Sequence, residues 1–258
     1  MHISLGRKKQ SEGHIKRFED ALTSVFFGTL RYLPPRIVIE FFISLLGTKQ
    51  ALLKEGLAKL CSDDTNIKME FWPNCADEGR VEPDLKITLS SSSYLPIDLL
   101  IECKWKSGES SDCQLLGQWS ALKPSDRLKT YHVYLVKDLQ QANIDREQNI
   151  EKASVQFGEK DTQEWGDRLF AISWFEVLKA TFSLTDPDRY HQKVVTQWGK
   201  DMEEMFERIG IREFKGFSHL SKQIAVSEGR LFWDCPFHGF QRFVDVNIIP
   251  TRSVVFYS

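Results

Sequence analysis

The stretch VEPDLKITLSSSSYLPIDLLIECK, residues 81–104, decides what fold this chain is expected to adopt. Two segments rich in apolar and β-branched residues, 81–89 and 95–104, flank a run of serines, which is the pattern of two strands joined by a loop. Residues that pair across a hairpin have a constant sum of positions. Pairing Asp84 with Glu102 centres the turn inside the serine run, so the sequence predicts a hairpin with two carboxylates at one end.

The residue types at that end of the hairpin suit metal-assisted chemistry. Side chains alternate between the faces of a strand, so Glu102 and Lys104 point one way and Cys103 the other. Neighbouring carboxylates raise each other's pKa unless a cation joins them. Mg²⁺ takes oxygen ligands, activates water and neutralises charge that develops on a phosphate. With Lys104 at the exposed end of its strand, the set predicts phosphodiester hydrolysis.

Pro83-Asp84 and Glu102-Cys103-Lys104 together resemble the signature of the PD-(D/E)XK nuclease superfamily, which has the restriction-endonuclease-like fold. The resemblance implies that Asp84, Glu102 and the main-chain carbonyl of Cys103 bind Mg²⁺, for which Mn²⁺ can substitute. It also implies that Lys104 positions or activates the attacking water. The alternative for the same residues is a surface hairpin with an exposed Glu–Lys pair, which contributes little to stability.

The resemblance covers residues 80–136 and, through the order of the flanking elements, extends to residues 14–180. Many members carry a glutamate on the first helix that faces the site; here Glu19, at the edge of the apolar face, is the candidate catalytic residue and metal ligand. Many also carry a glutamine on the helix after the lysine strand. Gln114 is the candidate, with Gln118 in reserve. The alternatives are a solvent-facing Glu19 and ordinary exposed glutamines.

The whole chain predicts an α/β fold: a restriction-endonuclease-like core with a central mixed β-sheet flanked by helices. Apolar residues at helical spacing predict helices at 14–33, 35–47, 49–60, 112–122, 175–181 and 194–209. Alternating patterns predict strands at 67–72, 81–89, 95–104, 131–136 and 169–174. Residues 138–166 are expected to be a polar surface excursion with room for one short helix. The core is assigned to residues 1–186, and residues 187–258 to a helix-plus-strand extension, with aromatic strands near the C-terminus, packed on the core.

Composition narrows the class of protein without identifying a function. The 258 residues are 41% apolar and 27% charged, with a formal net charge of −2, which is typical of a soluble globular chain and unlike a coiled coil or disordered tail. The most apolar window, 37–46, contains Glu40 and is too short for a membrane span. The N-terminus lacks the apolar region of a secretory signal, and the five cysteines form no CxxC pair, so a cytoplasmic protein with reduced thiols is expected.

A local basic patch is enough to bind nucleic acid even when the net charge is near zero. Lys106, Lys123 and Arg127 follow the predicted site and are the candidate nucleic-acid contacts. Asp98 shares the face of Glu102 but lies four residues back, and it is expected to be solvated.

The sequence therefore predicts a Mg²⁺-dependent nuclease acting on DNA, in a bacterial defence or mobile-element context that the resemblance makes plausible. It leaves room for a homodimer or a partner protein. One alternative is a non-catalytic nucleic-acid-binding or assembly module built on a nuclease fold. Another is an unrelated α/β interaction protein in which Asp84 and Glu102 do not converge.

Overall fold

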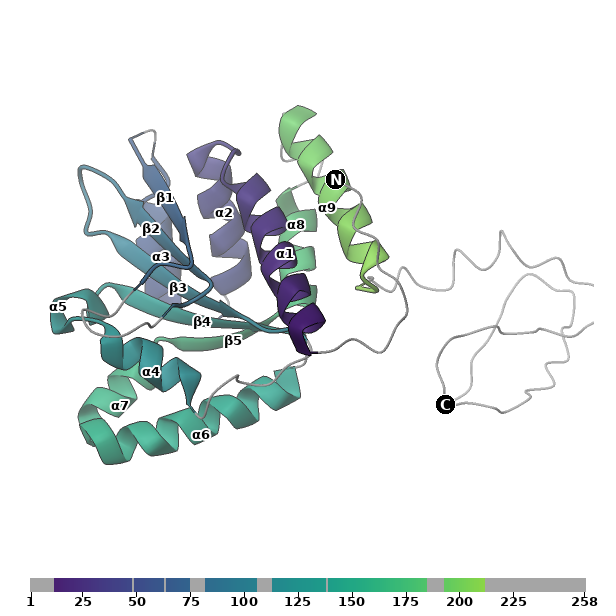
Figure 1. Cartoon of the computed structure of the whole chain (residues 1–258). Coiled ribbons are helices and arrows are strands. Elements are labelled where there is room, and N and C mark those ends of the chain that lie inside the picture. The colour runs from purple at the N-terminus through teal and green to yellow at the C-terminus, as the bar shows by residue number, and fades with distance from the viewer. Residues whose placement is uncertain are drawn as a thin grey trace, which may run out of the picture. The chain divides into compact units, whose positions relative to one another are not determined.

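A five-stranded mixed sheet lies between two layers of helices (Figure 1). The structure is a computed structural model that describes residues 12–47, 49–62, 64–74, 82–105, 113–137, 139–184 and 193–211. The aromatic strands expected near the C-terminus and the candidate contact Lys106 lie outside these residues. The α/β class with a mixed sheet flanked by helices is confirmed.

The sheet has the strand order β1-β2-β3-β4-β5, with β1, β2 and β3 antiparallel and β3, β4 and β5 parallel. Its strands are β1 (Asn66–Phe71), β2 (Leu85–Ser90), β3 (Ile97–Cys103), β4 (Thr130–Val136) and β5 (Leu169–Ser173). All five predicted strands are present, but the second begins at Leu85, so Asp84 directly precedes the strand instead of lying inside it.

The hairpin register is the one that the sequence predicts. Leu85 pairs with Ile101 and Leu89 with Ile97, which is the register that places Asp84 opposite Glu102 when it is continued by one residue. Odd-numbered residues of both strands are buried in one apolar core, so the even-numbered residues face the other helical layer. A slip of one residue would turn every one of these side chains to the wrong face, and this is why the pattern fixes the register.

The first helical layer and its core contain most of the large apolar residues. Its helices are α1 (Glu12–Leu30), α2 (Pro35–Leu46), α3 (Ala51–Lys59), α8 (Trp174–Leu184) and α9 (Lys193–Arg208). Pro35 occupies the first turn of α2, where its missing N–H costs nothing, and the helix ends at Leu46 with Gly47 as its C-cap. Phe26 of α1 packs against the rings of Trp174 and Phe206, which ties α1, α8 and α9 together.

Helix α9 lies beyond the predicted core boundary at residue 186, yet it packs on the helices of the core. Trp198 donates a hydrogen bond from Nε1 to Oγ1 of Thr29 at 3.0 Å, and Met202 and Phe206 are buried. The expected contact of this helix with the core is therefore observed, while the boundary itself stays a prediction. None of the described helices has the length and apolar character that a bilayer span requires.

The second layer covers the opposite face of the sheet with α4 (Gln114–Ala121), α6 (Leu139–Phe157) and α7 (Glu159–Gly166); the short α5 (Pro124–Arg127) precedes β4 (Figure 1). The prediction of a surface excursion at 138–166 is wrong, because this segment forms two helices that bury Trp165 and Ala153. Its inward face also carries Asp145 and Asn149, whose buried side chains are hydrogen-bonded. Polar residues on the buried face hid the helical periodicity.

Candidate active site

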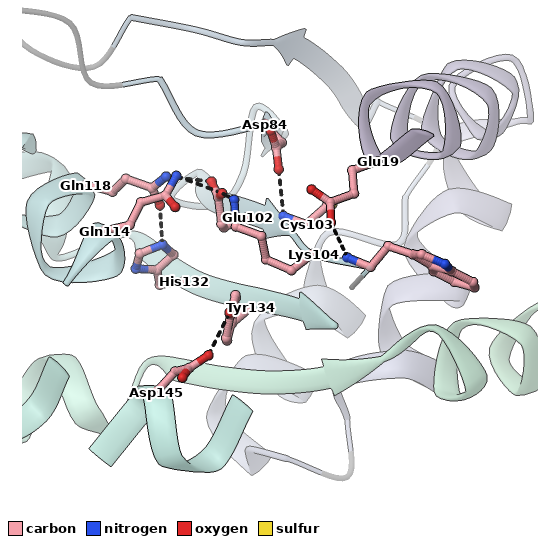
Figure 2. Close-up of polar contacts among 11 residues, drawn as sticks. Glu19, Asp84, Glu102, Cys103, Lys104, Gln114, Gln118, His132, Tyr134 and Asp145 are labelled. Carbon is pink, nitrogen blue, oxygen red and sulfur yellow. Dashed lines mark hydrogen bonds and ion pairs between the residues drawn. The ribbon is translucent and has the colours of Figure 1, made fainter. Parts of the chain in front are cut away.

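Asp84 is fixed over the end of β3 by the backbone. The amide of Cys103 donates to Oδ2 of Asp84 at 2.7 Å, and the amide of Trp72 donates to the Asp84 carbonyl at 3.1 Å. The pairing of β1 with β2 thus continues past the first residue of β2, and the Cys103 amide holds the aspartate side chain at the C-terminal end of β3 (Figure 2).

Glu102 is 1% exposed, and its carboxylate accepts three side-chain contacts. Oε1 accepts from Nζ of Lys104 at 2.6 Å and from Nε2 of Gln114 at 2.8 Å. Oε2 accepts from Nε2 of Gln118 at 2.7 Å. The two glutamines lie four residues apart on α4 and therefore share one helix face. Both the first candidate and the reserve candidate contact the predicted site, so neither is an ordinary exposed helix residue.

Lys104 is buried, at 8% exposure, and this corrects the expectation of an exposed lysine at the strand end. Its backbone amide donates to the Leu135 carbonyl at 2.7 Å, so the parallel pairing with β4 continues past β3 and holds the residue against the sheet. Burial acts to lower the pKa of Lys104, but the charge of Glu102, its hydrogen bond and Asp84 outweigh burial and raise that pKa. The ammonium is therefore held in its charged form by the carboxylates beside it.

Glu19 reaches the same strand end from α1. It is 7% exposed, and its Oε1 accepts a hydrogen bond from the backbone amide of Trp105 at 2.8 Å. The alternative of a solvent-facing Glu19 is therefore wrong. Glu19 and Asp84 thus accept hydrogen bonds from the backbone amides on either side of Lys104, those of Trp105 and Cys103. Glu102 accepts from the Lys104 side chain, so all three carboxylates lie around this strand end (Figure 2).

The surroundings of Asp84 disfavour the charged form of its carboxyl. Burial, and then the charge of Glu102, raise the pKa of Asp84 to about 7, against the opposing effects of the Cys103 amide and the Lys104 ammonium. Ionising Asp84 beside Glu102 is thus costly, and a divalent cation bound by oxygen ligands would remove that cost. The donor chemistry therefore fits Mg²⁺.

The side chains nevertheless do not form a closed metal cage as they stand. Within the described ranges, no three acidic, imidazole or thiol groups converge on one point in a way that could hold a metal ion. Glu102 is instead turned toward Lys104 and the α4 glutamines. Coordination by Glu102 would require its oxygens to be shared between these donors and the cation.

His132 was not identified from the sequence, although it belongs to the same network. Its Nε2 lies 2.9 Å from Oε1 of Gln118, and burial lowers the pKa of the imidazole to about 3. His132 and Tyr134 lie on β4 in the register positions beside Leu100 and Glu102 of β3. The alternation of β4 would have placed His132 on the face of Glu102, had the parallel register been known.

Tyr134 leads to a second buried network, which no motif in the sequence predicts. Its hydroxyl donates to Oδ2 of Asp145 on α6 at 3.0 Å. Asn149, one turn further along α6, donates to the Asp145 carbonyl and accepts from the amide of Leu116 on α4. These bonds join α4 and α6 to the sheet beneath the site.

Asp98 is not solvated as expected, because it is 1% exposed at the other end of β3. Oγ1 of Thr88 donates to its Oδ1 at 2.7 Å. Lys86 and Lys129 approach its Oδ2 at 3.4 and 3.6 Å. The charge is therefore compensated within the sheet, and Asp98 has no contact with the candidate site.

The candidate nucleic-acid contacts have different surroundings. Lys123 is exposed at the start of α5. Arg127 lies over the rings of Trp119 and Phe157 and donates to the Ser120 carbonyl, so part of its binding capacity is used within the fold.

Comparison of the chain with protein-family models, curated proteins and solved structures found no match.

Proposed function

We propose that this protein is a metal-dependent nuclease of the PD-(D/E)XK type that hydrolyses phosphodiester bonds in DNA. The observation that carries the proposal is the meeting of Asp84, Glu102 and Lys104 at one strand end, in the register that joins the two halves of the motif. The restriction-endonuclease-like identity of the core is part of the same proposal, and the mixed α/β sheet is compatible with it.

The proposed metal ligands are the carboxylates of Asp84 and Glu102, with the Cys103 carbonyl and Glu19 as further ligands. Bound Mg²⁺ would supply a water of lowered pKa and neutralise charge on the phosphate. The remaining residues act around it. Lys104, kept charged by Glu102, stabilises negative charge on the scissile phosphate or positions the water.

The α4 glutamines and Glu19 have supporting roles in this mechanism. Gln114 and Gln118 hold the two Glu102 oxygens in place. Glu19 accepts the Trp105 amide and thereby holds the chain that follows Lys104. Fixed donors of this kind favour catalysis because they need not reorganise during the reaction.

The decisive experiment combines cleavage and binding. Wild type is incubated with single- and double-stranded DNA and RNA in Mg²⁺, Mn²⁺ or EDTA, and binding is followed by fluorescence anisotropy. Lys104→Met keeps the buried aliphatic volume but removes the ammonium, so cleavage should fall by roughly 10²–10³-fold while the affinity for DNA changes little. Lys160→Met, on the exposed surface of α7, is the matched control and should cut normally.

One observation favours a second candidate, a non-catalytic nucleic-acid-binding module. Among the described residues the acids do not form a closed three-ligand group, and Glu102 is held by Lys104 and two glutamines. If wild type binds nucleic acid but never cuts it with any divalent metal, and Lys104→Met binds equally well, this second candidate replaces the nuclease.

A further inference from the structure

A buried chain of hydrogen bonds connects Glu102 with a histidine on the neighbouring strand. Nε2 of Gln118 donates to Oε2 of Glu102 at 2.7 Å. The other end of the same amide, Oε1, lies 2.9 Å from Nε2 of His132. Gln118 and His132 are both fully enclosed, so no solvent molecule can replace either partner without a rearrangement of the core (Figure 2).

The chemistry of the three groups fixes the direction of both bonds. A carboxylate only accepts, so the amide must turn its NH₂ group toward Glu102 and its carbonyl toward His132. A carbonyl also only accepts, so Nε2 of His132 must carry the proton. Burial lowers the pKa of His132 to about 3, which leaves a single ring proton. That proton lies on Nε2, and the buried Nδ1, which has no hydrogen-bond partner among the described residues, is the bare nitrogen.

Gln118 depends on this arrangement more than Gln114 does. Gln114 is only half-buried at the first turn of α4, whereas Gln118 is enclosed between β3, β4 and the helix. If the Gln118 amide turned over, its carbonyl would face the Glu102 carboxylate and two acceptors would be left in contact. An unsatisfied buried acceptor pair is strongly unfavourable, so Glu102 would have to move.

We propose that His132 is a positioning residue for the candidate metal site: it donates from Nε2 to Gln118 and thereby keeps the Gln118 amide donating to Glu102. The consequence for function rests on the proposed nuclease, in which Glu102 is a metal ligand. The direction of the two hydrogen bonds does not rest on the proposed function, because that direction is a property of the metal-free protein. Removal of a group that orients a metal ligand without contacting the metal typically costs 10–100-fold in metal affinity or activity.

The first test reads the direction of the bonds in the metal-free protein. Long-range ¹H–¹⁵N NMR distinguishes the two neutral tautomers of a histidine from the imidazolium. The expected result is a neutral His132 protonated on Nε2 throughout pH 5–8. A proton on Nδ1, or an imidazolium at pH 6, overturns the proposal whether or not the protein is a nuclease.

The second test compares two substitutions of similar length that differ in the donor. His132→Gln offers an amide NH₂ near the position of Nε2, whereas His132→Met offers none. His132→Met should weaken Mn²⁺ binding, measured by isothermal titration calorimetry, by roughly 10–100-fold and lower kcat with little change in KM for DNA. His132→Gln should recover most of both losses.

Thr88→Val is the matched control, because it removes a donor from the buried carboxylate of Asp98 at the opposite end of β3. It should lower stability but leave Mn²⁺ affinity unchanged. If His132→Met behaves in the same way, His132 has only a structural role and the proposal is overturned. A wild-type protein that binds no Mn²⁺ and cuts no nucleic acid contradicts the nuclease instead, and the NMR result then decides the hydrogen-bond proposal alone.

Discussion

Replacement of Asp84 by asparagine should stabilise the metal-free protein at neutral and alkaline pH, although it removes a proposed metal ligand. The pKa of Asp84 rises from an ordinary 3.8 to about 7, and each pKa unit corresponds to about 1.4 kcal/mol. Ionisation therefore costs the native state up to about 4 kcal/mol relative to the unfolded chain. Asparagine avoids this cost, and its Oδ1 can still accept the hydrogen bond from the Cys103 amide.

The sign of the pH dependence follows from proton binding. Between about pH 4 and pH 7 the native protein holds a proton on Asp84 that the unfolded chain has already lost, so the free energy of unfolding of wild type falls as pH rises. Below that window both states are protonated and the stability contributed by Asp84 is fully present. Asp84→Asn should therefore gain stability over wild type progressively up to pH 7 and keep that gain above it.

The assay is urea denaturation of wild type and Asp84→Asn from pH 4.5 to 8.5 in EDTA. Asp201→Asn is the matched control: this aspartate is exposed on α9 and accepts a hydrogen bond from the Gln197 side chain, and its replacement should change stability much less than Asp84→Asn does. Mg²⁺ should narrow the difference, because a ligand at a hundred times its Kd stabilises wild type by about 2.7 kcal/mol, and about a thousand times its Kd, worth about 4.1 kcal/mol, should cancel it. If Asp84→Asn is the less stable protein at pH 8 in EDTA, the account of the carboxylate pair is wrong.

Two further predictions concern the sheet and the helix α9. Asp98→Asn should lower the free energy of unfolding by about 1–3 kcal/mol, because Lys86 and Lys129 lose their buried partner. Cleavage should be unchanged, because the candidate site lies at the other end of β3. A loss of cleavage in a folded variant would contradict this separation. A deletion ending at Asp186 removes α9 and uncovers Phe26 and Trp174, so cooperative thermal unfolding should be lost, whereas a chain ending at Arg212 should keep it. A sharp transition at the full-length midpoint in the shorter chain would show that α9 contributes nothing to the core.

The hairpin could be predicted because its determinants are local. Alternating apolar residues, one run of serines and the position of a proline are enough to place Asp84 opposite Glu102, and a one-residue slip would bury the polar face. Glu19 could be placed on the edge of an apolar helix face by the same argument. The part of the sheet that Glu19 contacts depends on how α1 packs. No pattern in the sequence specifies that packing.

Helices α6 and α7 of the second layer were missed for a physical reason. Helix α6 buries Asp145 and Asn149. The Asn149 side chain donates to the Asp145 carbonyl, and the Asp145 carboxylate accepts from the hydroxyl of Tyr134. Hydropathy patterns score such residues as solvent-facing, since an isolated polar group pays a large penalty for burial. The periodicity of α6 is therefore visible only once its partners on α4 and β4 are known.

The same distinction between local and distant determinants explains why the two carboxylates of the motif differ. In sequence, Asp84 and Glu102 are two acids in register across a hairpin, and nothing separates their roles. In the fold, the Glu102 carboxylate accepts from a lysine and two glutamines. The Asp84 carboxylate accepts from the Cys103 backbone amide, and its pKa is raised. The glutamines come from α4, and the orientation of one of them depends on His132 of the parallel strand β4. The crossover from β3 through α4 to β4 thus decides which acid is held by side-chain donors, while Asp84 keeps a raised pKa.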